Sequence, residues 1–180
     1  MSNTITQSLL TKIAKIKMLI CDVDGVLTDG TIFMGSGNIE LKRFSVIDGA
    51  GFFLAKAGGL KLAVISGRYS PATELRLKEL PIDAVYNGTV NKLEPYQSIK
   101  SEFGLSDDEI AYVGDDLIDI PVLNLVGLPI AVENAYAPVK KRAAYVTKKR
   151  GGEGAVREVI DLLLEGQQKF KLALKNLEKD

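Results

Sequence analysis

Several side chains that could bind a cation or attack phosphorus follow short apolar runs of the sequence. Carboxylates follow two of these runs, and a hydroxyl and an amine follow others: Asp22, Asp24, Asp115, Asp116, Asp119, Ser66 and Lys92. If the runs are parallel strands, these side chains converge, because ligands bind at the carboxyl ends of the strands in an open sheet. Crowded carboxylates repel one another unless a cation lies among them. Oxygen ligands without His or Cys favour a hard cation, so the pattern predicts a Mg²⁺ site, with Mn²⁺ or Co²⁺ as alternatives.

Each of these residues also has a structural interpretation when it is taken alone. An Asp-x-Asp segment such as 22–24 is commonly a turn, and Ser66 before Gly67 is commonly a cap. Lys92 could be a solvated surface lysine. The functional interpretation depends on the conjunction, since each group comes directly after its own predicted strand.

The composition excludes several other chemistries. The 180 residues include no His, so the chain contains no Ser-His-Asp triad, no Cys-His pair and no His-ligated metal. Lys and Arg total 23, as do Asp and Glu, and a net charge of 0 argues against binding to nucleic acid or to a membrane surface. The single Cys21 is expected to be buried and inert, which suits a reducing compartment. With no signal-peptide pattern and no apolar stretch of roughly 20 residues, we expect a cytoplasmic protein.

Apolar runs that alternate with helical patterns predict an α/β fold, a doubly wound Rossmann-like parallel sheet with helices on both faces. The predicted strands are 18–21, 60–65, 110–113 and 128–132, with possible edge strands at 83–86 and 145–146. The predicted helices begin at a cap on Asp48, at Ser70-Pro71, at Leu93, at Ser106 and near Val156. We expect one domain over 1–180 with a C-terminal tail at about 150–180.

A β-rich segment interrupts this alternation. Residues 31–34 and 39–44 flank Gly35-Ser36-Gly37-Asn38, which predicts a β-hairpin at about 30–44, inserted after the first strand. Neither this insertion nor 67–91 is large enough for a cap domain. The hairpin is too apolar for a free flap, so we expect a homo-oligomer assembled through it.

The motifs resemble those of the haloacid dehalogenase-like phosphatases. The matching pieces are Asp22-Val23-Asp24-Gly25-Val26-Leu27-Thr28-Asp29, then Ser66, Lys92 and Gly114-Asp115-Asp116-Leu117-Ile118-Asp119, in that order. The resemblance implies that Asp22 becomes an aspartyl phosphate and that Asp24 is the general acid and then the base. It implies Mg²⁺ held by Asp22, Asp115 and the main-chain carbonyl of Asp24. Ser66 and Lys92 would stabilise charge on the phosphoryl group, and Asp116 and Asp119 would orient Lys92 and metal-bound water, unless they are only helix caps.

The full pattern is similar to the capless 3-deoxy-D-manno-octulosonate 8-phosphate phosphatases of lipopolysaccharide biosynthesis. The further matches are Phe44-Ser45-Val46-Ile47-Asp48-Gly49, Ser66-Gly67-Arg68 and Gly151-Gly152-Glu153-Gly154-Ala155-Val156-Arg157-Glu158. The resemblance implies hydrolysis of a small anionic sugar phosphate by a tetramer that packs through its hairpins. The implied substrate contacts are Asp24, Ser45, Val46, Ile47, Asp48, Gly49, Arg68, Arg76 and Lys92, although Arg76 could be a solvated helix residue. Gly151-Gly152 is either a simple turn or the hinge of a tail that closes over a neighbouring site.

Other functions stay open at this point. A nine-carbon sialic-acid-type 9-phosphate or a broad range of sugar phosphates could be the substrate. A phospho-accepting receiver domain also uses Mg²⁺, Lys and an aspartyl phosphate, but its acceptor Asp ends the third strand, where this chain has Tyr86-Asn87. An inactive regulatory homologue is disfavoured because all the predicted catalytic side chains are present.

Overall fold

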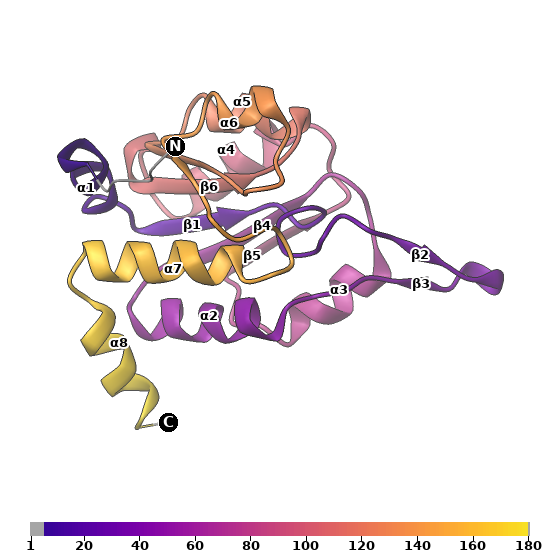
Figure 1. Ribbon diagram of the computed structural model, residues 1–180, viewed down its shortest axis with the longest axis horizontal. Coiled ribbons are helices and arrows are strands. Elements are labelled where there is room, and N and C mark those ends of the chain that lie inside the picture. The colour runs from indigo at the N-terminus through magenta and orange to yellow at the C-terminus, as the bar shows by residue number, and fades with distance from the viewer. Residues whose placement is uncertain (1–5, 180) are drawn as a thin grey trace.

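The apolar runs form one parallel six-stranded sheet in the computed structural model, which describes residues 6–179 (Figure 1). The strand order is β5-β4-β1-β6-β7-β8. The bounds are β1 Met18–Cys21, β4 Lys61–Ser66, β5 Ala84–Asn87, β6 Ile110–Gly114, β7 Leu128–Ala131 and β8 Tyr145–Val146. Every residue of β1 and β6 is buried, as expected for strands covered on both faces.

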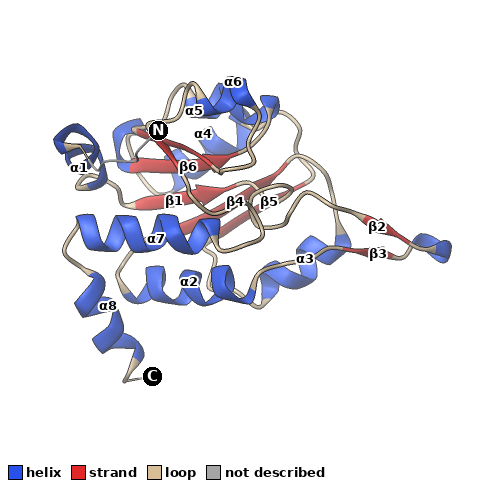
Figure 2. Ribbon diagram, in the orientation of Figure 1, coloured by secondary structure: helices blue, strands red, loops and turns tan. Residues whose placement is uncertain are grey.

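Helices cover both faces of the sheet (Figure 2). The longer helices α2 and α7 lie on one face with α3 and α8, and α4, α5 and α6 lie on the other. The helix bounds are α1 Gln7–Ile13, α2 Val46–Ala57, α3 Pro71–Lys78, α4 Leu93–Glu102, α5 Ile120–Leu123, α6 Ala137–Lys140, α7 Ala155–Gly166 and α8 Phe170–Leu177. Short 3₁₀ helices occupy Ser36–Asn38, Asp107–Glu109 and Leu117–Asp119. This arrangement confirms the predicted doubly wound fold, with β5 and β8 at the edges.

Four α-helices were not predicted, namely α1, α5, α6 and α8, and one predicted cap is wrong. The short helices α1 and α8 pack at the margins, where α8 lies against α2 and buries Ala173. Helix α2 is capped by Ser45, whose hydroxyl accepts from the Asp48 N–H at 3.3 Å, so Asp48 does not cap it. Asp48 lies instead in the first turn, where its side chain is free to serve another element.

The inserted hairpin is present but shorter than predicted. Its ladder joins only β2 (Phe33–Met34) to β3 (Glu40–Leu41), and it projects from the body of the protein (Figure 1). Residues 42–44 leave the ladder because Lys42 turns toward Asp24 and Phe44 bridges to Thr28. Between β1 and α2 the described chain carries only this hairpin, and between β4 and β5 only α3, so residues 6–179 include no cap domain. Across the same residues, no helix is both long and apolar enough to cross a membrane.

Candidate active site

The acidic residues meet where the winding of the sheet reverses. The chain runs outward from β1 through β4 to β5 and then returns to place β6 on the other side of β1. Asp22 follows β1 and Asp115 follows β6, and the Asp22 N–H donates to the Val113 carbonyl at 3.0 Å. One carboxylate oxygen from each of Asp22, Asp115 and Asp119 lies within 4.8 Å of the others. Residues 93 positions apart in the sequence thus form one cluster at the ligand-binding edge.

Lys92 is buried among these carboxylates. Its Nζ lies 2.7 Å from Asp22 Oδ1 and 2.6 Å from Asp119 Oδ1. Burial alone would lower the pKa of Lys92, but Asp22 and Asp119 outweigh it and the pKa is raised. Lys92 is therefore a fixed cation directed at the predicted nucleophile.

Asp119 is fully occupied in holding this arrangement. Its Oδ1 accepts from Lys92 and from the Tyr112 hydroxyl, at 2.6 and 2.7 Å. Its Oδ2 accepts from the backbone N–H groups of Asp115 and Asp116, at 2.9 and 3.1 Å. Asp119 consequently orients Lys92 and the loop after β6, and has no oxygen left for a cation. Asp116 is exposed and caps the following 3₁₀ helix by accepting from Leu117 N–H at 2.7 Å, whereas the ion pairs of Lys92 are with Asp22 and Asp119.

The residues of the cluster fit a hard cation. Asp115 Oδ1 is buried and has no hydrogen-bond partner. Burial, followed by repulsion from Asp22 and Asp119, raises the pKa of Asp115 to about 8. Burial also raises the pKa of Asp22 to about 6, although Lys92 acts in the opposite direction. Two buried carboxylates that resist ionising together are the donor set that a divalent cation stabilises.

A glycine lets the loop after β1 approach this cluster. Gly25 has φ +90°, and a Cβ at this position would collide with the Asp115 carboxylate. Gly151 and Gly152, at the start of the C-terminal segment, pack against the same loop after β1. The Gly152 N–H donates to the Val26 carbonyl at 3.0 Å, and a Cβ on Gly151 would strike the Gly25 carbonyl. Here Gly151-Gly152 forms a buried turn against the loop, and the helices α7 and α8 that follow it lie against α2.

The Asp24 side chain pairs with Lys42, which directly follows β3 of the hairpin. Lys42 Nζ lies 2.6 Å from Asp24 Oδ1, so the two side chains form an ion pair. Sequence reasoning missed Lys42. The available signal was a charged residue that alternates with apolar ones in the strand 39–44.

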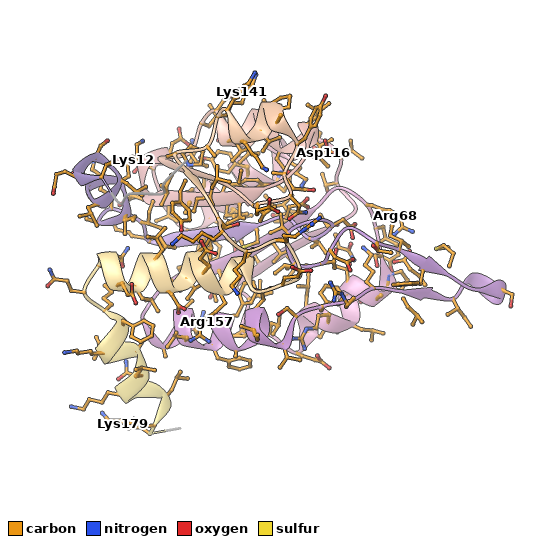
Figure 3. The ribbon with its side chains drawn as sticks, viewed as in Figure 1. Lys12, Arg68, Asp116, Lys141, Arg157 and Lys179 are labelled. Atoms are coloured by element: carbon orange, nitrogen blue, oxygen red, sulfur yellow. The ribbon has the colours of Figure 1, made fainter. Side chains whose placement is uncertain are left out.

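Ser66 is the last residue of β4, and Arg68 follows the strand. Ser66 is buried and its hydroxyl donates to the Arg68 carbonyl at 2.9 Å. The Arg68 guanidinium pairs with Glu40 of β3, and in Figure 3 Arg68 lies beside the base of the hairpin. Hydrogen bonds from Arg68 and Ser70 lower the pKa of Glu40 to about 2. The structure therefore brings Arg68 to the hairpin rather than to the acidic cluster.

The predicted substrate segment 45–49 divides into exposed and buried residues. Val46 and Ile47 are 79% and 59% exposed, whereas Asp48 is buried. Asp48 accepts from the N–H groups of Gly154 and Arg157, at 3.2 and 2.8 Å, because α7 begins at a glycine that offers no capping side chain. Both carboxylate oxygens of Asp48 thus accept hydrogen bonds from the start of α7. Because α7 begins more than 100 residues later, no local sequence pattern predicts this contact.

Gly49 and Arg76 lie side by side. A Cβ on Gly49 would collide with the Arg76 guanidinium, which also pairs with Glu79 at 2.7 Å. Arg76 is half-buried. This intermediate burial fits neither a fully solvated helix residue nor a residue enclosed in a substrate site.

Comparison with known proteins gives concordant results. A sequence model of the haloacid dehalogenase-like hydrolases matches residues 80–160. The chain is 44% identical to the 3-deoxy-D-manno-octulosonate 8-phosphate phosphatase KdsC of Escherichia coli over 166 residues, 92% of this chain and 88% of KdsC. The crystal structure of the Yersinia pestis 3-deoxy-D-manno-octulosonate 8-phosphate phosphatase is similar with a TM-score of 0.89, 42% identity and coverage of 92% of this chain and 89% of that one. The Moraxella catarrhalis phosphatase, in complex with magnesium, phosphate and 3-deoxy-D-manno-octulosonate, is similar with a TM-score of 0.89, 37% identity and coverage of 93% and 97%.

Proposed function

Because this chain belongs to the 3-deoxy-D-manno-octulosonate 8-phosphate phosphatase family of haloacid dehalogenase-like hydrolases, we propose that it releases phosphate from that sugar acid phosphate. The products are the free sugar acid and inorganic phosphate, and the reaction belongs to lipopolysaccharide biosynthesis. The observation that carries this proposal is the meeting of Asp22, Lys92 and Asp115 at the point where the sheet winding reverses.

Asp22 is the proposed nucleophile. Its carboxylate oxygen attacks phosphorus, the bond to the sugar oxygen breaks, and an aspartyl phosphate forms. Lys92, held by Asp22 and Asp119, and the Ser66 hydroxyl stabilise negative charge on the phosphoryl oxygens. Asp24 donates a proton to the departing sugar alkoxide and then removes one from the water that hydrolyses the aspartyl phosphate.

Mg²⁺ is the proposed cofactor, as the Moraxella phosphatase contains magnesium and the donor set here is oxygen only. The carboxylates of Asp22 and Asp115 and the main-chain carbonyl of Asp24 would hold it. When bound, it supplies the positive charge that lets an anionic carboxylate approach an anionic phosphate.

The direct test is phosphate release from 3-deoxy-D-manno-octulosonate 8-phosphate, with and without a chelator. We expect turnover that depends on Mg²⁺ and is eliminated in Asp22→Asn. Parallel assays on a nine-carbon sialic-acid-type 9-phosphate and on simple sugar phosphates test the substrate. A higher kcat/KM for the nine-carbon compound would replace the eight-carbon assignment while leaving the chemistry intact.

We further propose that the protein is a homo-oligomer, a tetramer assembled through the hairpins, and that it acts in the cytoplasm. The support for assembly is the exposed apolar surface of the hairpin, where Phe33, Met34, Ile39 and Leu41 are each more than half exposed. Exposure of this extent is typical of a surface that is covered by another chain. Sedimentation as a monomer at micromolar concentration would contradict the proposed assembly.

A further inference from the structure

The strand that returns from the hairpin tip has two chemically different sides. Ile39 and Leu41 are 56% and 62% exposed, and they alternate with two charged residues that point toward the body of the protein. The side chains of Glu40 and Lys42 are only 7% and 0% exposed. Charged side chains are seldom buried in this way unless they are paired, so their partners indicate their role.

Both inward residues contact the start of α3. Glu40 accepts from the Ser70 hydroxyl at 2.5 Å, and Ser70 in turn caps α3 by accepting from the Thr73 N–H at 3.1 Å. Lys42 Nζ donates to the Thr73 hydroxyl at 3.2 Å. The hairpin is therefore fixed to the segment that follows Ser66, and Lys42 is held in a defined position by Thr73.

From that position Lys42 reaches Asp24, with Nζ 2.6 Å from Asp24 Oδ1. The Asp24 side chain is 26% exposed, whereas that of Lys42 is fully covered. A ligand in the site can therefore touch Asp24 but not Lys42. The partners of Lys42 are Asp24 and Thr73, in contrast to Lys92, which pairs with Asp22 and Asp119.

We propose that Lys42 is a positioning residue that orients the Asp24 carboxylate for proton transfer to the leaving oxygen. The inference rests on the proposed phosphatase function, in which Asp24 is the acid. Lys42 acts through Asp24 alone and does not bind the cation or the phosphoryl group. The inserted hairpin is thus a structural part of the active site of its own chain.

The first test compares substrates with different leaving groups. An alkyl phosphate needs a proton on its departing oxygen, whereas p-nitrophenyl phosphate releases a stable phenolate without one. We expect Lys42→Met to reduce kcat on a sugar phosphate by about 10- to 100-fold, with a much smaller loss on p-nitrophenyl phosphate. KM and the dissociation constant for Mg²⁺, measured by calorimetry, should change less than about 3-fold because Lys42 contacts neither the cation-binding carboxylates nor a substrate. The matched control is Lys56→Met, which removes a lysine paired with Asp83 outside the site and should leave both activities unchanged.

The second test is a double-mutant cycle with Asp24→Asn. If Lys42 acts through Asp24, Lys42→Met has no further effect on the sugar phosphate rate in the Asp24→Asn background. Equal losses on both substrates, additive losses in the cycle, or wild-type kinetics in Lys42→Met would each overturn the proposal. If Lys42→Met does not fold, Lys42→Arg is assayed in its place, and the same loss confined to alkyl phosphates is expected from the altered geometry. The assays use any alkyl phosphate that the wild type hydrolyses, so they are independent of which sugar is the natural substrate.

Discussion

The acidic cluster and the hairpin both hold charged side chains, but they hold them in different ways. In the cluster, Asp119 has four hydrogen-bond donors from four residues, which lie on β6 or in the loops that follow β5 and β6. In the hairpin, Lys42 has two partners, and the two-residue strands pair only with each other. The nucleophile is therefore held by many redundant contacts of the core, whereas the predicted acid depends on a few contacts of a peripheral element. The difference indicates that attack on phosphorus and proton transfer can be impaired separately.

Asp22→Asn should produce the largest effect. The amide is not a nucleophile toward phosphorus, so we expect kcat to fall by about 10³-fold or more on every substrate, including p-nitrophenyl phosphate. Phosphate release under saturating substrate measures it. If Asp22→Asn keeps its activity on p-nitrophenyl phosphate, the nucleophile lies outside the acidic cluster. The contrast drawn between the cluster and the hairpin would then be wrong.

The free energy of unfolding of the metal-free protein should decrease as the pH rises, because of Asp22 and Asp115 in the acidic cluster. Because the pKa values of Asp22 and Asp115 are raised to about 6 and about 8, the folded protein binds more protons than the unfolded chain between about pH 4 and pH 8. Their contribution to the free energy of unfolding therefore decreases as the pH rises through this range. Glu40, whose pKa is lowered to about 2, is ionised in both states above about pH 6 and adds no slope there.

Urea denaturation of chelator-treated protein at pH 5 and pH 8 checks this expectation. Mg²⁺ should stabilise the protein more at pH 8 than at pH 5, because binding requires ionised carboxylates. Asp115→Asn should remove most of the pH dependence. Equal stabilisation by Mg²⁺ at both pH values would show that the buried carboxylates are not its ligands.

Asp48→Ala should reduce stability by about 1–3 kcal/mol, because it leaves the N–H groups of Gly154 and Arg157 without their acceptor. Chemical denaturation measures the loss. If Asp48 instead contacts the substrate, KM will rise sharply while stability is unchanged. This outcome would restore the role predicted from the sequence.

Tyr112→Phe should have the smallest effect. It removes one of the four donors to Asp119 at a cost of about 1 kcal/mol, and the remaining three should keep Lys92 in place and kcat within about 10-fold of wild type. The matched control is Tyr96→Phe, a buried tyrosine whose hydroxyl donates to Asp107 outside the cluster. A loss of activity in Tyr112→Phe as large as that expected for Lys42→Met would contradict the redundancy of the cluster.

The same contrast explains what the sequence could predict. Asp22, Ser66 and Asp115 each end or follow a buried strand, so their convergence follows from topology alone. The edge strands and the cap at Ser70 were also predictable, because their signals are local. The roles of these residues stay predictions until activity is measured.

The contacts of Lys42 and Asp48 could not be predicted from the sequence, because they do not depend on local signals. Each is defined by a partner that no local pattern links to it: Thr73 lies 31 residues from Lys42, and Gly154 lies 106 from Asp48. The helices α1, α5, α6 and α8 were missed because they are short, with four to eight residues each. The hairpin ladder was overextended because β propensity does not reveal where tertiary contacts draw the chain away.

The two-sided segment 39–42 also limits how the hairpin can change in length. Because successive side chains point to opposite sides, inserting or deleting one residue in this segment would turn Lys42 outward and an apolar neighbour toward Asp24. Inserting or deleting a single codon would then disturb both the Asp24 acid and the exposed apolar surface. We therefore expect natural length variation in the hairpin to be confined to its tip at residues 35–38, or to occur in steps of two within the segment.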